Sequence, residues 1–377
     1  MRTMYTVPDL RQLHLEVSTR CNAECPMCAR NLFGATAPGL TETSMTLDQF
    51  RACLPEHVLA QLEIVDICGA YGDPAIAPEL LDICHHIHTI NPSTTIRIYS
   101  NGGLRTPTWW ARLAEIPGIT TIFAIDGLAT NSVYRRKVDI DKVLANAAAF
   151  IDAGGRAQWD YIAFAHNEHE IDSARARAAE LGFAEFSVKK TARFLRPLYE
   201  PAPELRPGDG IDAAPIYDRT GAVVGELRPP ADERLVNEVV LWARSIEARA
   251  EYFDAFFDTC TIQCQALDSS AIFVSATGHV YPCCWLYVQA TLPQLYRGQA
   301  ATDAQVHDLL TASGGANTLD AAEHPLDEIL ASEFFTAVER SWSTDTIAGG
   351  KLKVCSRVCG EGFSAYRRQF DRPDLVP

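Results

Sequence analysis

Short apolar segments alternate with amphipathic segments over residues 12–190, and this alternation constrains the fold more than any other feature of the chain. The apolar segments are rich in Ile, Val, Phe and Tyr, as β-strands usually are. Strands that alternate with helices form a parallel sheet with right-handed crossovers. The six units predict an α/β fold, a partial (β/α)6 barrel, in which ligands bind at the C-terminal ends of the strands.

The expected elements follow from this periodicity. The strands are expected at 13–18, 62–69, 95–100, 119–125, 157–165 and 184–190. The helices are expected at 46–60, 76–90, 106–115, 139–153 and 169–181. Thr46, Pro78 and Asp139 are expected helix starts, and Gly154-Gly155 and Gly182 are expected helix ends.

The alternation stops after Arg196, where prolines become frequent. We expect a hairpin at 216–227, a helix at 233–257 and a further helical stretch near 325–342. Three regions are therefore expected: a core at 1–196, a connector with a linking helix at 197–257, and a small C-terminal domain of a hairpin plus helices at 258–377.

The charge balance and the N-terminus restrict the partners. Asp and Glu number 48 against 33 Lys and Arg, a formal net charge of −15, which argues against a nucleic-acid partner. The N-terminus lacks the apolar core of a secretory signal, and no apolar run reaches the roughly 18 residues of a membrane span. We therefore expect a cytoplasmic protein without a membrane partner. Thiols stay reduced there, so the 12 cysteines are expected to bind metal or take part in chemistry.

Cys21, Cys25 and Cys28 follow the first expected strand with the spacing C-x3-C-x2-C. Three thiolates on one loop can hold a single compact inorganic centre. A [4Fe–4S] cluster normally takes four cysteines, so three would leave one iron open to an outside ligand. A zinc ion with a distant histidine as fourth ligand is the alternative.

Glycine-containing turns follow the next three expected strands. They are Gly69-Ala70-Tyr71-Gly72-Asp73-Pro74, Ser100-Asn101-Gly102-Gly103 and Ile125-Asp126-Gly127. In this order, behind the cysteine loop, they resemble the radical S-adenosylmethionine (SAM) superfamily over about residues 12–190. The resemblance implies a SAM-binding [4Fe–4S] cluster on the three cysteines and reductive cleavage of SAM to a 5′-deoxyadenosyl radical.

The resemblance also implies which residues bind SAM. Met27 is expected against the adenine. Gly72-Asp73 belongs to the turn that receives the SAM amino group, where the family commonly has Glu instead of this Asp. Ser100-Asn101 is expected near the methionine moiety, and Asp126 is expected to accept a ribose hydroxyl.

Polar residues follow the later strands. We expect His166 to act catalytically and Asn167 to bind the cofactor, with an N-cap role for Asn167 as the alternative. Tyr134-Arg135-Arg136, Lys189-Lys190 and Arg193 offer positive charge to the SAM carboxylate or to an anionic substrate, or lie on the solvated surface.

The C-terminal cysteines surround the segment IFVSATGHVYPC, which predicts a hairpin with its turn at Thr277-Gly278. This part resembles the SPASM extension, or its shortened twitch form. The resemblance implies one auxiliary [4Fe–4S] cluster on Cys264, Cys283, Cys355 and Cys359. Four thiolates also suit zinc, and spacing alone does not choose between Cys260 and Cys264 or between Cys283 and Cys284.

The leading expectation is a radical SAM oxidoreductase that dehydrogenates or cross-links a small metabolite or a peptide, with the auxiliary cluster as electron acceptor and a flavodoxin or ferredoxin as reductant. The alternative is an epimerase in which Cys68 or Cys284 donates a hydrogen atom. A non-enzymatic zinc protein is the third hypothesis.

Overall fold

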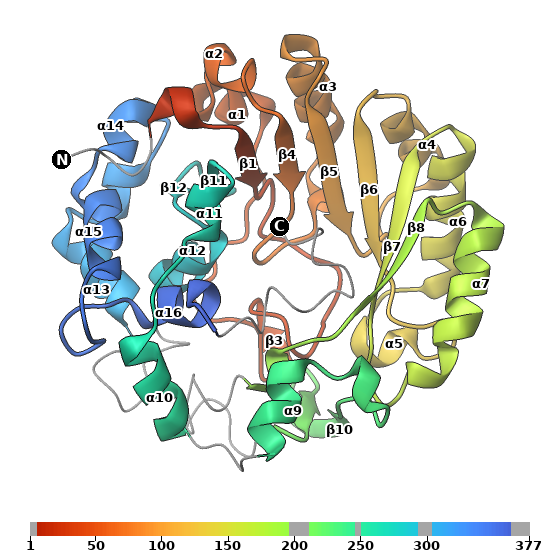
Figure 1. The fold of residues 1–377 in the computed structure, drawn as a ribbon. Coiled ribbons are helices and arrows are strands. Elements are labelled where there is room, and N and C mark those ends of the chain that lie inside the picture. Colours follow the sequence, from red (N-terminus) through yellow and green to blue (C-terminus); the bar gives the residue numbers. More distant parts are fainter. Residues whose placement is uncertain (1–5, 196–210, 246–249, 293–303, 363–377) are drawn as a thin grey trace.

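A single eight-stranded sheet organises the computed structural model, which describes residues 6–195, 211–245, 250–292 and 304–362 (Figure 1). Seven neighbouring strands are parallel, in the order β11-β1-β4-β5-β6-β7-β8, and β12 is antiparallel to β11. The strands are β1 (Gln12–Leu15), β4 (Ile64–Ile67), β5 (Thr95–Ser100), β6 (Ile119–Ala124), β7 (Arg156–Ile162), β8 (Glu185–Lys189), β11 (Ala271–Val274) and β12 (Val280–Tyr281).

Helices cover the outer side of the curved sheet (Figure 1). They are α1 (Leu47–Cys53), α2 (Glu56–Leu59), α3 (Leu80–Ile90), α4 (Pro107–Ala114), α6 (Ile140–Asp152) and α7 (Ile171–Leu181), whereas the short α5 (Asn131–Tyr134) lies at the C-terminal ends of the strands. The order of strands and helices confirms the expected partial barrel. Across the described residues, no helix combines the length and the apolar character that crossing a bilayer requires.

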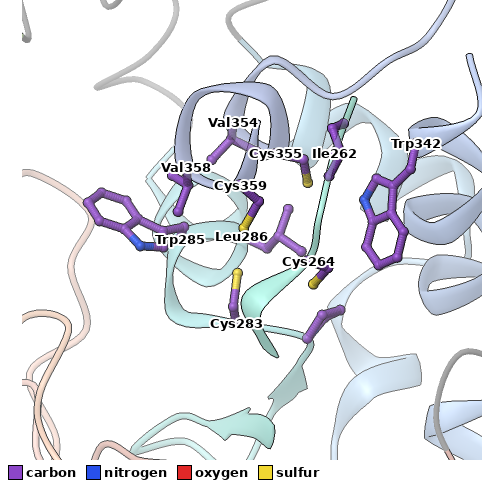
Figure 2. A pocket seen from close by; sticks show the side chains of 11 residues that line it. Ile262, Cys264, Cys283, Trp285, Leu286, Trp342, Val354, Cys355, Val358 and Cys359 are labelled. Atoms are coloured by element: carbon purple, nitrogen blue, oxygen red, sulfur yellow. The ribbon is translucent and has the colours of Figure 1, made fainter. Parts of the chain in front are cut away.

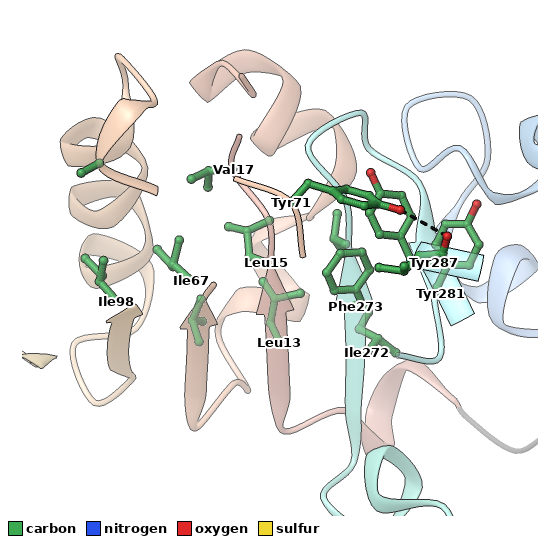
Figure 3. Close-up of a cluster of buried hydrophobic side chains, with 14 of the residues drawn as sticks. Leu13, Leu15, Val17, Ile67, Tyr71, Ile98, Ile272, Phe273, Tyr281 and Tyr287 are labelled. Carbon is green, nitrogen blue, oxygen red and sulfur yellow. Dashed lines mark hydrogen bonds between the residues drawn. The ribbon is translucent and has the colours of Figure 1, made fainter. Parts of the chain in front are cut away.

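The hydrophobic core lies between the strands and the outer helices. Leu13 and Leu15 are buried there, and His14 between them points to the opposite face, as side chains alternate along a strand. Figure 3 shows Leu13 and Leu15 between Ile67 of β4 and Ile272 of β11. β1 is thus flanked by a paired strand along each of its two edges, which fixes the position of the loop that follows it.

Two of the helices expected in the barrel differ from the prediction. Thr46 caps α1 with a reciprocal capping box to Gln49, as expected. The expected helix 46–60 is two helices, however, because Pro55 supplies no amide hydrogen to continue α1 and is the N-cap residue of α2. Pro78 does not begin α3, which starts at Leu80, after a 3₁₀ turn at Pro74–Ile76.

The connector forms the expected hairpin, with β9 (Ala214–Tyr217) antiparallel to β10 (Val223–Leu227). The helix expected at 233–257 does not begin at 233, and residues 246–249 within it lie outside the described residues. A 3₁₀ turn at Glu233–Leu235 and a cap at Asn237, whose side chain accepts from Val239, precede α9 (Glu238–Ser245), and α10 follows at Ala250–Thr259. Residues 197–210 of the expected connector lie outside the described residues.

The C-terminal hairpin β11–β12 extends the barrel sheet. Ala271–Val274 pairs in parallel register with Gln12–Leu15, so β1 lies inside the sheet rather than at its edge. Helices α11 (Gln265–Asp268), α12 (Cys284–Thr291), α13 (Gln305–Ala312), α14 (Leu326–Leu330), α15 (Glu333–Trp342) and α16 (Lys353–Cys359) surround this hairpin. The division at 1–196, 197–257 and 258–377 stays a prediction, since the sheet is continuous between the first and the last of these regions.

Candidate functional site

A cavity of about 430 Å³ lies at the C-terminal ends of the barrel strands. Its wall contains Cys21, Cys25 and Cys28 together with Met27, so the three thiols and the expected adenine neighbour face the same space. Burial raises the pKa of Cys25 to about 11, and Arg135 opposes this rise. Binding of iron by Cys25 would therefore displace a proton from its thiol.

The three thiols could hold an iron–sulfur cluster without converging on a single point. Among the residues that the structure describes, no three His, Cys, Asp or Glu side chains converge tightly enough to bind one ion. A zinc ion needs its ligands within about 2.0–2.3 Å of one point. In a [4Fe–4S] cluster each cysteine binds a different iron, which allows wider spacing between the thiols.

The turn after β4 is held by a buried carboxylate at the end of β1. Glu16 Oε1 accepts hydrogen bonds from the amides of Tyr71, at 2.7 Å, and Gly72, at 3.3 Å. A side chain at Gly72 would place its Cβ 1.9 Å from the carbonyl oxygen of Ser18, so this turn requires glycine. Burial raises the pKa of Glu16 to about 7, against the opposing hydrogen bonds.

Asp73 joins this turn to the turn after β5. Its carboxylate accepts from Ser100 Oγ at 2.9 Å, from the Asn101 amide at 2.8 Å and from Asn101 Nδ2 at 2.7 Å. A further bond comes from the amide of Ala75. Burial raises the pKa of Asp73, and these donors oppose the rise. Asp73, Ser100 and Asn101 all line the cavity, and their mutual hydrogen bonds fix the shape of its wall.

Asp126 has a different environment from the one expected for a ribose ligand. It is fully buried, and its two oxygens accept from the Ile162 amide and from Arg135 Nε, each at 2.6 Å. It is not among the described residues that line the cavity, whereas Arg135 is. Arg135 Nη1 lies 3.9 Å from Cys25 Sγ. Asp126 thus orients Arg135 toward the cysteine loop.

His166 and Asn167 also lie outside the described lining of the cavity. Asn167 is fully buried, donates to the carbonyls of Asp126 and Ile162, and accepts from the amide of Phe164. Its side chain therefore links the loops after β6 and β7. His166 stacks on Phe164 at 5.4 Å, and burial lowers its pKa.

Two cysteines outside the first loop face the same cavity. Cys68, before the glycine turn, and Cys284, the first residue of α12, both line it, and burial raises the pKa of each thiol to about 12. Asp160 and Lys189, ion-paired at 2.6 Å, lie on the barrel side of the cavity.

A second, small cavity of about 20 Å³ is enclosed by Cys264, Cys283, Cys355 and Cys359. Figure 2 shows these side chains between apolar neighbours that include Leu286 and Trp342. Of the paired alternatives, Cys264 and Cys283 line this cavity, whereas Cys260 and Cys284 do not. Cys260 Sγ instead lies 3.6 Å from the carbonyl oxygen of Phe257.

Three consecutive residues connect the two cavities. Cys283 faces the small cavity, Cys284 faces the large one, and Trp285 lines both. The following helix also contacts the turn after β4, because Tyr71 donates from its hydroxyl to the Val288 carbonyl at 3.2 Å. The C-terminal cysteines and the wall of the main cavity therefore share one short segment of chain.

Some residues of the site were not singled out from the sequence. Glu16 and Asp160 are single acidic residues within the apolar segments LHLEVS and AQWDYIAFA. Burying a single carboxylate in an apolar strand costs free energy unless the carboxylate is ion-paired or hydrogen-bonded. An acidic residue inside an apolar segment is therefore the sequence signal that could have identified Glu16 and Asp160 as site residues.

Solved structures of the same fold cover most of this chain. SuiB from Streptococcus suis, bound to the precursor peptide SuiA, is 16% identical with a TM-score of 0.55, and the match covers 93% of this chain and 72% of SuiB. The structure of anSMEcpe with bound AdoMet is 15% identical with a TM-score of 0.51, covering 92% of this chain and 88% of that one. No family model and no curated protein matches the sequence. The chain has the fold of the radical SAM enzymes.

Proposed function

We propose that this chain is a radical SAM oxidoreductase with an auxiliary [4Fe–4S] cluster, acting on a small metabolite or a peptide. The observation that carries the proposal is the convergence of Cys21, Cys25 and Cys28 with the turns after β4 and β5 on one cavity. When bound there, the cluster supplies the electron that cleaves SAM to a 5′-deoxyadenosyl radical, which removes a hydrogen atom from the substrate. A flavodoxin or ferredoxin is the expected source of that electron.

The residues of the chain supply binding and exclusion of water. The backbone of the turn at Gly72, which Glu16 holds in place, is the expected contact for the SAM amino group. Arg135 and Arg193 line the cavity near Cys25 and are the expected partners of the SAM carboxylate. Apolar side chains such as Met27, Ile122 and Val288 reduce the access of water to the reacting atoms.

The second set of thiols supports an oxidative outcome. Cys264, Cys283, Cys355 and Cys359 surround an apolar cavity next to the first, and four thiolates leave no iron open for substrate. A fully ligated cluster can still accept an electron. SuiB was solved with a bound precursor peptide, which supports keeping peptides among the possible substrates.

Iron analysis of anaerobically reconstituted protein tests this proposal. We expect about eight irons per native chain and about four after Cys355→Ser with Cys359→Ser. Cys84→Ala is the matched control, since Cys84 is buried on α3 outside both cavities, and it should retain about eight. A native chain with about four irons, and SAM cleavage that is unaffected by the double substitution, would refute the auxiliary cluster.

An epimerase is the second candidate, and the position of Cys68 and Cys284 in the main cavity favours it. A thiol there could return a hydrogen atom to a substrate radical. Deuterium uptake from solvent into a product of unchanged composition, abolished by Cys284→Ala or Cys68→Ala, would support this reaction. A product lighter by two hydrogen atoms would support oxidation.

A further inference from the structure

The small cavity creates an electrostatic problem for the cluster that we propose there. An oxidised [4Fe–4S] core with four thiolates carries roughly two negative charges, and reduction adds one more. The described lining of the cavity consists of cysteines and apolar residues and contains no charged side chain. Buried negative charge is costly without a nearby cation. A compensating positive charge is therefore expected close behind the lining.

Arg357 meets this requirement. It lies on α16 between Cys355 and Cys359, and only 2% of its surface is exposed. Its guanidinium carbon is 5.5 Å from the ring centroid of Trp285, which lines the cavity. The helix thus places a buried cation between two of the four cysteines in sequence, in a poorly screened interior.

Lys351 and Lys353, two other cations close in sequence to the C-terminal cysteines, contact polar groups outside the cavity lining. Lys351 is 4% exposed, and its ammonium donates to the carbonyls of Asp258 and Cys260 at 2.7 and 3.1 Å. Lys353 is ion-paired with the exposed carboxylate of Asp254 at 2.6 Å. Among these three, Arg357 is the cation that stacks directly on a side chain of the cavity wall.

We propose that Arg357, held against Trp285, is a positioning residue whose buried charge raises the reduction potential of an auxiliary cluster bound by Cys264, Cys283, Cys355 and Cys359. This inference rests on the proposed function, because it requires that cluster. A nearby cation stabilises the reduced cluster, which carries more negative charge, relative to the oxidised one. Arg357 therefore makes the auxiliary centre a better electron acceptor.

The test isolates the auxiliary cluster and measures its potential. In a chain with Cys21→Ala, Cys25→Ala and Cys28→Ala, about four irons should remain after anaerobic reconstitution. The signal of the reduced cluster is then followed by electron paramagnetic resonance during a redox titration. This readout needs neither SAM nor substrate.

Substitutions at Arg357 then separate charge from packing. Arg357→Met removes the charge at similar volume and should move the midpoint potential to a more negative value, whereas Arg357→Lys should stay close to the parent. Arg340→Met is the matched control, because Arg340 on α15 is 61% exposed and paired with Glu333. It should leave the potential unchanged.

Each outcome decides the question. An unchanged potential in Arg357→Met, or a shift of equal size in Arg340→Met, overturns the inference. If Arg357→Met binds no iron, Arg357→Lys decides the question. An Arg357→Lys chain that binds iron and has the midpoint potential of the parent supports the role of charge. An Arg357→Lys chain that binds no iron overturns the inference. A parent chain without iron refutes the auxiliary cluster itself, which separates the failure of the proposed function from the failure of this inference.

Discussion

Glu16 provides a test of the electrostatics of the turn after β4. Its side chain is fully buried, and burial raises its pKa from 4.5 to about 7. Each pKa unit corresponds to about 1.4 kcal/mol, so ionisation of Glu16 destabilises the folded state by about 3 kcal/mol. The folded chain binds the proton more tightly than the unfolded chain, and stability is therefore lost as the pH rises from about 4.5 to 7.

Glu16→Gln removes this titration but keeps an oxygen that accepts from the amides of Tyr71 and Gly72. The difference in free energy of unfolding between the variant and the native chain should increase by about 2 kcal/mol from pH 5.5 to pH 8. The remainder of the expected change of about 3 kcal/mol falls below pH 5.5. Above pH 8 the difference should be constant. Other titrating groups are common to both chains and cancel in the comparison.

Urea unfolding of the two chains, followed anaerobically by tryptophan fluorescence at several pH values, measures this difference. Glu63→Gln is the control, because Glu63 is 70% exposed at the start of β4 and should show no such dependence. The reasoning is wrong if the difference between Glu16→Gln and native does not change with pH, or if the variant becomes relatively less stable as the pH rises.

Three substitutions test other contacts. Gly72→Ala should lower the free energy of unfolding by about 3 kcal/mol, measured in urea, because the added Cβ would lie 1.9 Å from a backbone carbonyl oxygen. Gly225→Ala is the control: its Cβ would meet no atom closer than 3.4 Å, and its effect should be less than about 1 kcal/mol. Equal effects of the two substitutions would contradict this. Asp126→Asn removes the carboxylate that orients Arg135 and should weaken SAM binding about tenfold in anaerobic calorimetry, so native affinity would exclude this role. Thr46→Ala breaks the capping box of α1 and should lower the unfolding free energy by about 1 kcal/mol, and an unchanged urea midpoint would contradict it.

Local patterns predicted the elements of the barrel well. The apolar run at 95–100 coincides with β5, and the capping signals of Thr46 and Asp139 mark α1 and α6. The errors occurred where local signals compete. Proline at 55 divides one expected helix, because the next helix can start with it but the previous one cannot continue through it.

The partners of the site residues depend on contacts that sequence does not display. Asp126 was expected to face a ribose, but Arg135 and the amide of Ile162 occupy its oxygens. Similarly, spacing left Cys283 and Cys284 equivalent, and only the start of α12 between them directs one thiol to each cavity. Such outcomes follow from the packing of distant segments, which periodicity does not encode.

The pairing of β1 with β11 has a consequence for biosynthesis. Gln12 lies beside Ala271 in the sheet, so the strand that carries the cysteine loop lacks one of its neighbours until more than two thirds of the chain has left the ribosome. Pairing over such a sequence separation is slow, because a long loop must close first. Iron delivered before that point would meet a loop without its supporting sheet. Cluster insertion in the cell is therefore expected to follow synthesis of the C-terminal hairpin, and a chain truncated before residue 271 should fail to mature.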